Sequence, residues 1–337
     1  MNKLVRVNNQ LSKPKYLQVM HAVLDGIETG NYKKGQLLPS INEMANANKT
    51  AKETIAKAYA GLRQQGVILS KAGKGFYVAD TKTKTGLNIF VLFDTFYAFK
   101  ETIYSALKAA LPKNTRFHIL FHHYSVRQFE EHIKDALGNY NFYVIMPHFN
   151  SDVSAIVNTI PRDKLLLLDR DIPTISPGYA AVYQDFENDV FTNLQQALVL
   201  IKKYKNLHLI VGKEHLQHVP APIIKGYKRF CKKENITGLI VDSLEEKNMN
   251  PGDAYLIFHD TDMVHFIKYC EKMKWKPGKD IGLISFDDTD LKEILLGGIT
   301  VITTDFKQLG TTAGQLINEK RMEKIANPTM FIKRKTL

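Results

Sequence analysis

The sequence has little of what several classes of protein require. Its 337 residues include only two cysteines, Cys231 and Cys270, which cannot build a disulfide framework and suit a reducing compartment. No unbroken apolar run approaches the roughly 20 residues of a membrane-spanning helix. The first residues lack an apolar core of signal-peptide length. These absences predict a cytoplasmic protein without a membrane partner, and two buried thiols with a structural role.

Motifs typical of enzymes and metal sites are absent as well. The residues after the first strand of the α/β region, Asp94-Thr95-Phe96-Tyr97, contain none of the glycines of a nucleotide-binding Gly-x-Gly-x-x-Gly turn. The pairs His122-His123 and Asp260/Asp262 do not have the spacing of a metal-binding motif. We therefore expect a protein that is not an enzyme and that needs no cofactor and no metal ion.

Acidic residues are scarce in the first quarter of the chain. The whole sequence has 46 Lys+Arg and 34 Asp+Glu, a net charge of +12. Residues 1–86 hold 14 of the basic and only 5 of the acidic residues, so +9 of this charge lies there. A small basic module on a nearly neutral body indicates a polyanionic partner. Nucleic acid is favoured over a membrane because no basic amphipathic anchor is present.

The basic region contains the pattern of short amphipathic helices. Apolar residues recur every three or four positions over 16–27, which predicts a first helix. Ser40 and Glu43 have the spacing of a capping box, and Thr50 and Glu53 repeat it. Each box predicts the start of a further helix. Two short helices joined by a tight connection are the helix-turn-helix arrangement.

Two β-prone runs follow the helices. They occupy 67–69 and 76–78 and flank a turn rich in glycine and lysine, which predicts a hairpin and completes a winged helix. In such a module a helix presents side chains to base edges in the major groove, while lysines of the wing meet phosphates or the minor groove. The DNA contacts predicted on this basis are Lys52, Thr54, Lys57, Lys71 and Lys74.

A series of short motifs runs through about residues 13–79. They are Leu38-Pro39-Ser40, Glu43-Met44-Ala45, Thr54-Ile55, Ala58-Tyr59, Leu62, Gly66 and Gly73-Lys74-Gly75-Phe76-Tyr77-Val78. In this order and spacing they resemble the winged-helix domain of GntR-type bacterial transcription regulators. The resemblance implies DNA binding and adds to the predicted contacts Ser40, Asn42, Ala51 and Gly75.

Two positions depart from the pattern of that family. Asn42 stands where an arginine is usual, and Ala51-Lys52 stands where Ser-Arg is usual. Lys52 thus replaces a planar bidentate guanidinium with a point charge. We therefore expect an operator sequence that differs from those of the relatives.

Beyond a segment without apolar residues at 81–86, which is typical of a linker, short apolar runs alternate with helical patterns. The alternation predicts parallel sheets covered by helices, and the number of strands indicates two sheets. The predicted strands are 88–93, 117–121, 143–146, 164–168, 179–183, 206–211, 238–240, 254–258, 280–285 and 300–303. The predicted helices are 99–111, 126–137, 189–204, 222–234, 262–273 and 309–325.

Polar and aromatic residues gather where these strands end. Ligands of open parallel sheets bind at the carboxyl ends of the strands. Carboxylates and imidazoles beside aromatic rings suit a sugar, because its hydroxyls pair with planar acceptors and its C–H face packs on a ring. Alternatively, each aspartate only caps the next helix. The effector contacts predicted from these positions are Asp94, Phe96, Tyr97, His122, His148, Asp169, Arg170, Asp185, Asp260 and Asp287.

A second series of motifs covers about residues 87–333. It comprises Leu166-Leu167-Leu168-Asp169-Arg170, Gly226-Tyr227, His259-Asp260-Thr261-Asp262-Met263, Lys276-Pro277-Gly278-Lys279-Asp280-Ile281, Leu283-Ile284-Ser285-Phe286-Asp287-Asp288 and Leu309-Gly310 with Ala313. These motifs are similar to the effector domain of LacI-type repressors, which shares its fold with periplasmic sugar-binding proteins. The resemblance implies two Rossmann-like lobes, three crossovers and a bound sugar that contacts Asp169, Asp287 and a polar residue near Asp260.

One position departs from the LacI-type pattern. The common arginine three residues before the Gly-Tyr pair is Ile223 here, so recognition from this segment is expected to use Lys225 or His215. Acidic residues outnumber basic ones at the strand ends, and a phosphate needs clustered cations or a glycine-rich helix start. We therefore expect a neutral monosaccharide rather than a sugar phosphate.

These observations predict an α/β protein with three parts. Residues 1–80 form a winged helix-turn-helix, 81–86 a linker, and 87–337 a periplasmic-binding-protein-like effector domain with two parallel sheets. Its first lobe takes about 87–185 and 304–332, and its second takes 186–303.

The expected function is a sequence-specific transcription regulator, a repressor of carbohydrate-utilisation genes controlled by a small sugar. Because one winged helix offers few base contacts, we expect a homodimer on double-stranded operator DNA. The alternative is a sugar-binding protein whose basic module contacts RNA or protein.

Overall fold

The computed structural model describes residues 14–64, 66–71, 73–79, 87–212 and 219–337. The chain divides into two compact units. The first holds residues 1–90 with 112–118 and 131–142, and the second holds 91–111, 119–130 and 143–337. The predicted linker at 81–86 lies outside the described residues, and the domain boundaries drawn from the sequence stay predictions.

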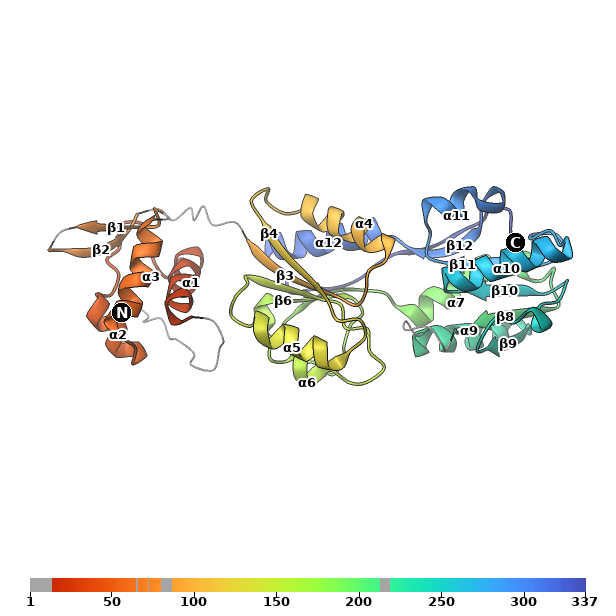
Figure 1. Cartoon of the computed structure of the whole chain (residues 1–337), viewed down its shortest axis with the longest axis horizontal. Helices are drawn as coiled ribbons and strands as arrows, with labels where there is room; N and C mark the ends of the chain where they lie inside the picture. The colour runs from red at the N-terminus through yellow and green to blue at the C-terminus, as the bar shows by residue number, and fades with distance from the viewer. Residues whose placement is uncertain (1–13, 65, 72, 80–86, 213–218) are drawn as a thin grey trace. The chain divides into compact units, whose positions relative to one another are not determined.

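Helices and an antiparallel hairpin form the N-terminal module, and its winged helix-turn-helix prediction is confirmed (Figure 1). The hairpin pairs Ile68 with Val78 and Lys71 with Gly75. The third helix begins at Lys52, one residue later than a capping box at Thr50 predicts. The elements are α1 (Lys15–Glu28), α2 (Ile41–Asn48), α3 (Lys52–Gln64), β1 (Ile68–Lys71) and β2 (Gly75–Val78).

Several residues of the sequence motifs in this module hold its helices and hairpin together. The Ser40 hydroxyl accepts from the Glu43 amide at 3.2 Å, and the Glu43 carboxylate accepts from the Ser40 amide at 2.7 Å, as a capping box requires. The Tyr59 hydroxyl donates to the Pro39 carbonyl at 2.7 Å, and its ring meets the edge of Phe76 at 4.9 Å. These contacts fix α3 to the start of α2 and to the wing.

The rest of the described chain builds two six-stranded sheets. The first contains β3 (Asn88–Phe93), β4 (Arg116–Phe121), β5 (Phe142–Ile145), β6 (Leu165–Asp169), β7 (Ala180–Tyr183) and β13 (Lys324–Ala326). The second contains β8 (Asn206–Ile210), β9 (Thr237–Val241), β10 (Ala254–Ile257), β11 (Gly282–Phe286), β12 (Thr300–Thr304) and β14 (Thr329–Ile332). Their orders are β13-β7-β6-β5-β3-β4 and β14-β12-β11-β10-β8-β9. All ten predicted strands are therefore present, with ends shifted by a few residues.

The C-terminal end of the chain differs from the prediction. The helix expected over 309–325 ends at Glu319, because Lys320 adopts a left-handed conformation with φ of 54°. The two strands that follow, β13 and β14, were not predicted. Strand β14 pairs antiparallel with β12, so the second sheet is mixed and residues 329–332 belong to it rather than to the first lobe. The chain passes between the sheets after β7, β12 and β13, which matches the three expected crossovers.

Helices join the strands and pack closely in pairs, α12 against α4 and α7 against α9. A Cβ at Gly310 would meet the Ile103 carbonyl, and one at Gly226 would meet the Glu187 carbonyl, so both close approaches require glycine. The helices are α4 (Ala98–Ala109), α5 (Val126–Ala136), α6 (Ser154–Val157), α7 (Phe186–Gln196), α8 (Leu198–Ile201), α9 (Ala221–Glu234), α10 (Asp260–Met273), α11 (Asp290–Ile294) and α12 (Phe306–Glu319). Within the described ranges, no helix is long and apolar enough to cross a membrane.

Candidate functional site

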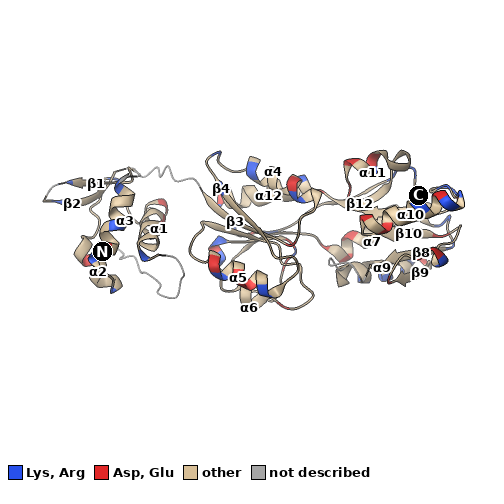
Figure 2. Cartoon of the chain, viewed as in Figure 1, with Lys and Arg blue, Asp and Glu red and all other residues tan. Residues whose placement is uncertain are grey.

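The N-terminal module carries its basic residues on its surface, and Figure 2 shows Lys and Arg on α3 and on the hairpin. Of the predicted DNA contacts, Lys52 lies exposed at the start of α3, and Lys74 lies exposed at the turn of the wing. Gly75 follows with φ of 97°, a conformation that glycine adopts without strain. Asn42 and Ala51 are exposed at the starts of the two helices.

Several other predicted contacts also take part in the module's own structure. The Ser40 hydroxyl caps α2, and Thr54 is half-buried. The Lys57 ammonium lies 4.2 Å from the centre of the Tyr16 ring, and the Lys71 ammonium lies 4.8 Å from that of Tyr77. These cation–π contacts hold two of the predicted lysines against the module.

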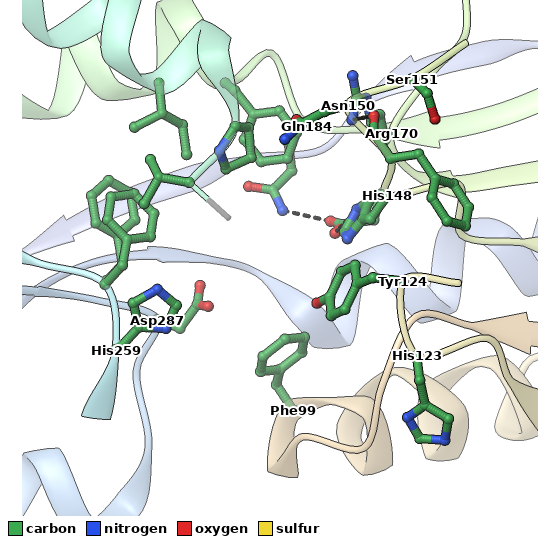
Figure 3. A pocket seen from close by; sticks show the side chains of 18 of the residues that line it. Phe99, His123, Tyr124, His148, Asn150, Ser151, Arg170, Gln184, His259 and Asp287 are labelled. Carbon is green, nitrogen blue, oxygen red and sulfur yellow. Dashed lines mark hydrogen bonds and ion pairs between the residues drawn. The ribbon is translucent and has the colours of Figure 1, made fainter. Parts of the chain in front are cut away.

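The second unit contains a pocket of about 830 Å³ at the carboxyl ends of strands from both sheets. Figure 3 shows His148, Arg170 and Tyr124 lying across the cavity from Asp287 and His259. The lining is rich in phenylalanine. It comprises Phe99, His123, Tyr124, Ser125, Val126, His148, Phe149, Asn150, Ser151, Asp169, Arg170, Gln184, Phe186, Val219, Pro220, Ile223, Phe258, His259, Phe286, Asp287 and Phe306.

Four of the predicted effector contacts line this pocket: His148, Asp169, Arg170 and Asp287. Asp169 is the last residue of β6 and Asp287 follows β11, with φ of 70° and 56°. Left-handed backbone is uncommon outside glycine and is frequent at functional sites. Equivalent positions in the two sheets thus place a carboxylate in the same cavity.

A series of buried ion pairs connects the pocket lining with the interior of the protein. Asp94 is fully buried, with its two carboxylate oxygens 2.7 Å from the Lys100 ammonium and 2.7 Å from His148 Nδ1. The other ring nitrogen of His148 lies 3.0 Å from Asp169 Oδ2. Asp169 Oδ1 accepts from the Gln184 amide at 2.5 Å. His148 therefore forms ion pairs with two carboxylates, that of Asp94, which is buried, and that of Asp169, which lines the cavity.

The pairing fixes the protonation of these groups at neutral pH. Burial alone would lower the pKa of His148, but Asp94 and Asp169 outweigh burial and raise it to about 9. Burial alone would raise the pKa of Asp94, but Lys100 and His148 hold it well below its usual range. Burial would also raise the pKa of Asp169, but its contact with His148 outweighs burial and lowers it. The imidazolium of His148 thus stands between two carboxylates.

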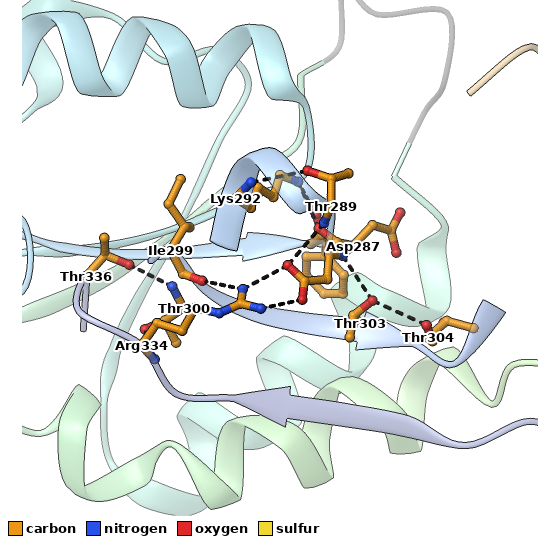
Figure 4. Close-up of polar contacts among 11 residues, drawn as sticks. Asp287, Thr289, Lys292, Ile299, Thr300, Thr303, Thr304, Arg334 and Thr336 are labelled. Carbon is orange, nitrogen blue, oxygen red and sulfur yellow. Dashed lines mark hydrogen bonds and ion pairs between the residues drawn. The ribbon is translucent and has the colours of Figure 1, made fainter. Parts of the chain in front are cut away.

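The loop that carries Asp287 is clamped from two sides (Figure 4). The buried Lys292 ammonium donates to the carbonyls of Phe286 and Asp287 at 2.7 and 2.9 Å. The next residue, Asp288, accepts a bidentate pair from Arg334 at 2.8 and 2.6 Å. Burial raises the pKa of Asp287 to about 6, with Lys292 opposing the rise. Its carboxylate is therefore mostly ionised at pH 7.

Other predicted effector contacts lie outside the described lining, and their surroundings explain why. Asp94 serves the buried charges behind His148. Burial lowers the pKa of His122 to about 4, and this neutral ring stacks on Phe149 while its Nε2 lies 3.0 Å from the Met146 carbonyl. Phe96 is 80% exposed, and Tyr97 stacks on Phe99 at 5.8 Å.

The remaining predicted contacts are on the surface or outside the described chain. Asp185 is the exposed N-cap residue of α7, where its carboxylate accepts from the Asn188 side-chain amide but makes no capping hydrogen bond to the helix backbone. Asp260 is 67% exposed and pairs with Lys292 at 2.9 Å. Lys225 is exposed on α9 and lies outside the described lining. His215 lies outside the described residues.

Some pocket residues were not among the predicted contacts. Gln184, directly after β7, enters the cavity in place of its neighbour Asp185, and the Thr304 hydroxyl donates to its amide oxygen at 2.5 Å. Tyr124 also lines the cavity and donates to Asp94 at 3.2 Å. The position directly after a strand is the signal that could have selected Gln184.

The charge of the lining is balanced rather than acidic. Asp169 and Asp287 face Arg170 and the protonated His148, whereas the other acidic strand-end residues of the described chain lie elsewhere. The expected excess of carboxylates in the pocket is therefore wrong for the described lining. In the same described ranges, no group of three His, Cys, Asp or Glu is placed to hold a metal ion.

The N-terminal module and the part with the two sheets resemble different groups of known proteins. The family described as "Bacterial regulatory proteins, gntR family" matches residues 15–78. The HTH-type transcriptional regulator GalR of Streptococcus thermophilus is 23% identical over 251 residues, which cover 60% of this chain and 75% of that protein.

Solved structures resemble the part with the two sheets. The trehalose repressor from Escherichia coli has a TM-score of 0.60 at 17% identity, covering 73% of this chain and 99% of its own. A periplasmic binding protein/LacI transcriptional regulator from Alkaliphilus metalliredigens, complexed with D-xylulofuranose, has a TM-score of 0.60 at 12% identity, covering 74% and 99%. The two-lobed fold predicted from the sequence is confirmed. The named relatives are regulators rather than enzymes, which also agrees with the prediction.

Proposed function

We propose that this chain, a transcription regulator with a GntR-type DNA-binding domain at residues 15–78, is a repressor of carbohydrate-utilisation genes that a small sugar controls. The observation that carries the proposal is the pocket of about 830 Å³, on a chain that also has a winged helix. Its Asp169, Asp287 and Gln184 offer planar hydrogen-bonding groups beside aromatic rings, which is the chemistry of sugar recognition.

The DNA interface in this proposal consists of the start of α3 and the wing. Lys52 reaches base edges in the major groove from the N-terminus of α3, and Lys74 neutralises a phosphate at the tip of the hairpin. Asn42 and Ala51, exposed at the starts of the helices, flank Lys52. Because the operator lies on bacterial DNA, the protein works in the cytoplasm.

A homodimer on a two-fold operator follows from the small number of base contacts that one module makes. The second unit has an apolar surface suited to a second copy, formed by Leu291, Ile294, Leu295 and Leu296, of which Leu291 and Ile294 are 66% and 70% exposed. Substituting Leu291 and Ile294 together by serine should shift the protein toward the monomer in sedimentation equilibrium. The matched control Val199→Ser, at a residue that is 77% exposed, should not do so.

A neutral sugar fits the pocket better than a sugar phosphate. The positive charge of His148 is already taken up by Asp94 and Asp169, and the Arg170 guanidinium donates to the Phe149 carbonyl at 2.6 Å. A phosphate would therefore meet no cluster of uncommitted cations among the described lining residues. Hydroxyl groups, in contrast, find acceptors in both carboxylates.

Two measurements test this function. A thermal-shift screen over neutral sugars and their phosphates should find a ligand that stabilises the protein by about 2.7 kcal/mol at a hundredfold excess over Kd. A footprint on DNA upstream of the gene should show a protected two-fold site. A footprint that fails while the protein binds RNA or another protein would favour the alternative function of the basic module.

A further inference from the structure

One wall of the pocket is apolar. Val219, just before α9, and Ile223, in the first turn of α9, line it together with Phe258 and Phe286. Phe258 directly follows β10, and Phe286 is the last residue of β11. The two rings stack with their centres 3.6 Å apart and their planes 16° apart. Val219, Ile223 and Phe286 belong to one hydrophobic core, and Phe258 packs against it. The core of this part of the protein thus opens into the cavity.

The opposite wall carries the hydrogen-bonding groups. His148, Asp169 and Gln184 form a connected set at 3.0 and 2.5 Å, and Arg170 lies beside them. All four come from the carboxyl ends of strands in the first sheet or from the residues just after them. Asp287 and His259, which follow the two stacked phenylalanines in the chain, add polar groups on the side across the cavity from His148 and Arg170 (Figure 3). The cavity therefore has a polar part and an apolar part.

A free sugar matches only the first part. Its hydroxyls project on all sides, and those that faced Val219 and Ile223 would lose their hydrogen bonds to water without replacement. The cavity of about 830 Å³ also falls in the range of pockets that hold larger ligands. Ile223 brings an aliphatic group to this lining.

We propose that the effector is a glycoside with an apolar aglycone, an aromatic or alkyl group that packs against Val219, Ile223, Phe258 and Phe286. The proposal rests on the proposed function, because the sugar ring of the same ligand occupies the polar part. Asp169 and Gln184 take the hydroxyls of the ring, and Asp287 lies where the sugar and the aglycone meet. The apolar wall adds affinity because binding removes both it and the aglycone from water.

The test uses matched pairs of ligands in titration calorimetry with the full-length protein. Methyl and phenyl glycosides of glucose, galactose, mannose and xylose are compared as both anomers. For the sugar that binds, we expect the phenyl glycoside to bind about tenfold or more tightly than its methyl partner. The substitutions Ile223→Thr and Val219→Thr should each reduce this ratio while the methyl glycoside keeps its affinity within about twofold.

Because Val219→Thr keeps the shape of the side chain, this variant still tests the apolar wall if Ile223→Thr folds poorly. Val199→Thr, at a residue 77% exposed on α8, is the matched control and should leave the ratio unchanged. Equal binding of methyl and phenyl glycosides would overturn the aglycone site and leave the sugar site standing. A phenyl preference that survives both pocket variants would also overturn it. If no glycoside of either kind binds, the proposed function fails together with this inference.

Discussion

The surface of the winged helix and the pocket of the second unit are built in opposite ways. In the winged helix, Lys52 and Lys74 are exposed on a scaffold held together by other residues, such as Tyr59 and Pro39. In the pocket, Asp169 is both a lining residue and part of a buried chain of charges. Substitutions at the DNA surface should therefore change binding alone, whereas substitutions in the pocket change binding, charge and stability together.

The largest expected effect is on stability, at a residue that does not touch the ligand. Asp94→Ala leaves the Lys100 ammonium, which is 3% exposed, without its partner at 2.7 Å. Removing one partner of a buried ion pair costs about 3–5 kcal/mol. Asp185→Ala, at an exposed aspartate that comes after β7 of the same sheet, should change the free energy of unfolding by less than about 0.5 kcal/mol. Denaturant unfolding that gives equal values for both variants would contradict the buried network.

The next effect appears in the pH dependence of stability. The pKa of His148 is about 9 in the folded protein, whereas that of a histidine in the unfolded chain is near 6.5. The stabilisation is therefore complete below pH 6.5 and is lost as the pH rises through 9, by roughly 3 kcal/mol.

Unfolding curves of the wild type between pH 6 and pH 10 should show this loss of stability, together with the changes that other titrating groups cause. His148→Gln, which cannot carry the charge, should lose less stability over the same range. Parallel pH curves for the two proteins would show that His148 is not held protonated by Asp94 and Asp169.

A smaller effect, this time on ligand affinity, is expected at the cavity wall. Asp169→Asn keeps the shape of the side chain but loses one acceptor, and the sugar hydroxyl it served stays unpaired. Affinity for the sugar should fall by about 1–3 kcal/mol, or roughly 5- to 150-fold. Operator binding in the absence of sugar should not change. Calorimetry showing wild-type affinity would remove Asp169 from the site.

The smallest effect is expected at the wing. Lys74→Ala should reduce the slope of log affinity against log salt by about one, and it should weaken all DNA sequences alike. Lys52→Ala should in addition blur the preference for the operator. The control is Lys247→Ala, a lysine of the second unit that is 75% exposed, which should leave the salt slope unchanged. An unchanged slope for Lys74→Ala would place the DNA surface elsewhere.

The same contrast explains what could be predicted from the sequence. The winged helix is built from local motifs, so capping residues and periodicity are enough to place α1, α2 and the hairpin. The ten predicted strands of the two sheets are short, mainly apolar runs, and such runs can also be recognised locally. Strands β13 and β14 were missed because they are short, partly exposed and stabilised by pairing with distant strands.

The pocket was harder to predict, because a residue after a strand can point into the cavity or away from it. Asp94 and Asp169 both stand at such positions, but only Asp169 lines the described cavity, since Lys100 and His148 enclose Asp94. Gln184 and Asp185 are neighbours, and the chain turns one inward and the other to the surface. Which of two polar neighbours enters the site depends on tertiary contacts that no local pattern records.

The central claim is that the ligand in the pocket controls the winged helix on DNA. The most direct measurement is operator affinity with and without a saturating effector, in the wild type and in Asp169→Asn. Allosteric coupling of about 1–3 kcal/mol predicts a change of roughly 5- to 150-fold in the wild type, and operator DNA must change effector affinity by the same factor. At an effector concentration that saturates the wild type but not the variant, Asp169→Asn should show little of this change. An effector that binds the wild type tightly and leaves its operator affinity unchanged would contradict the account.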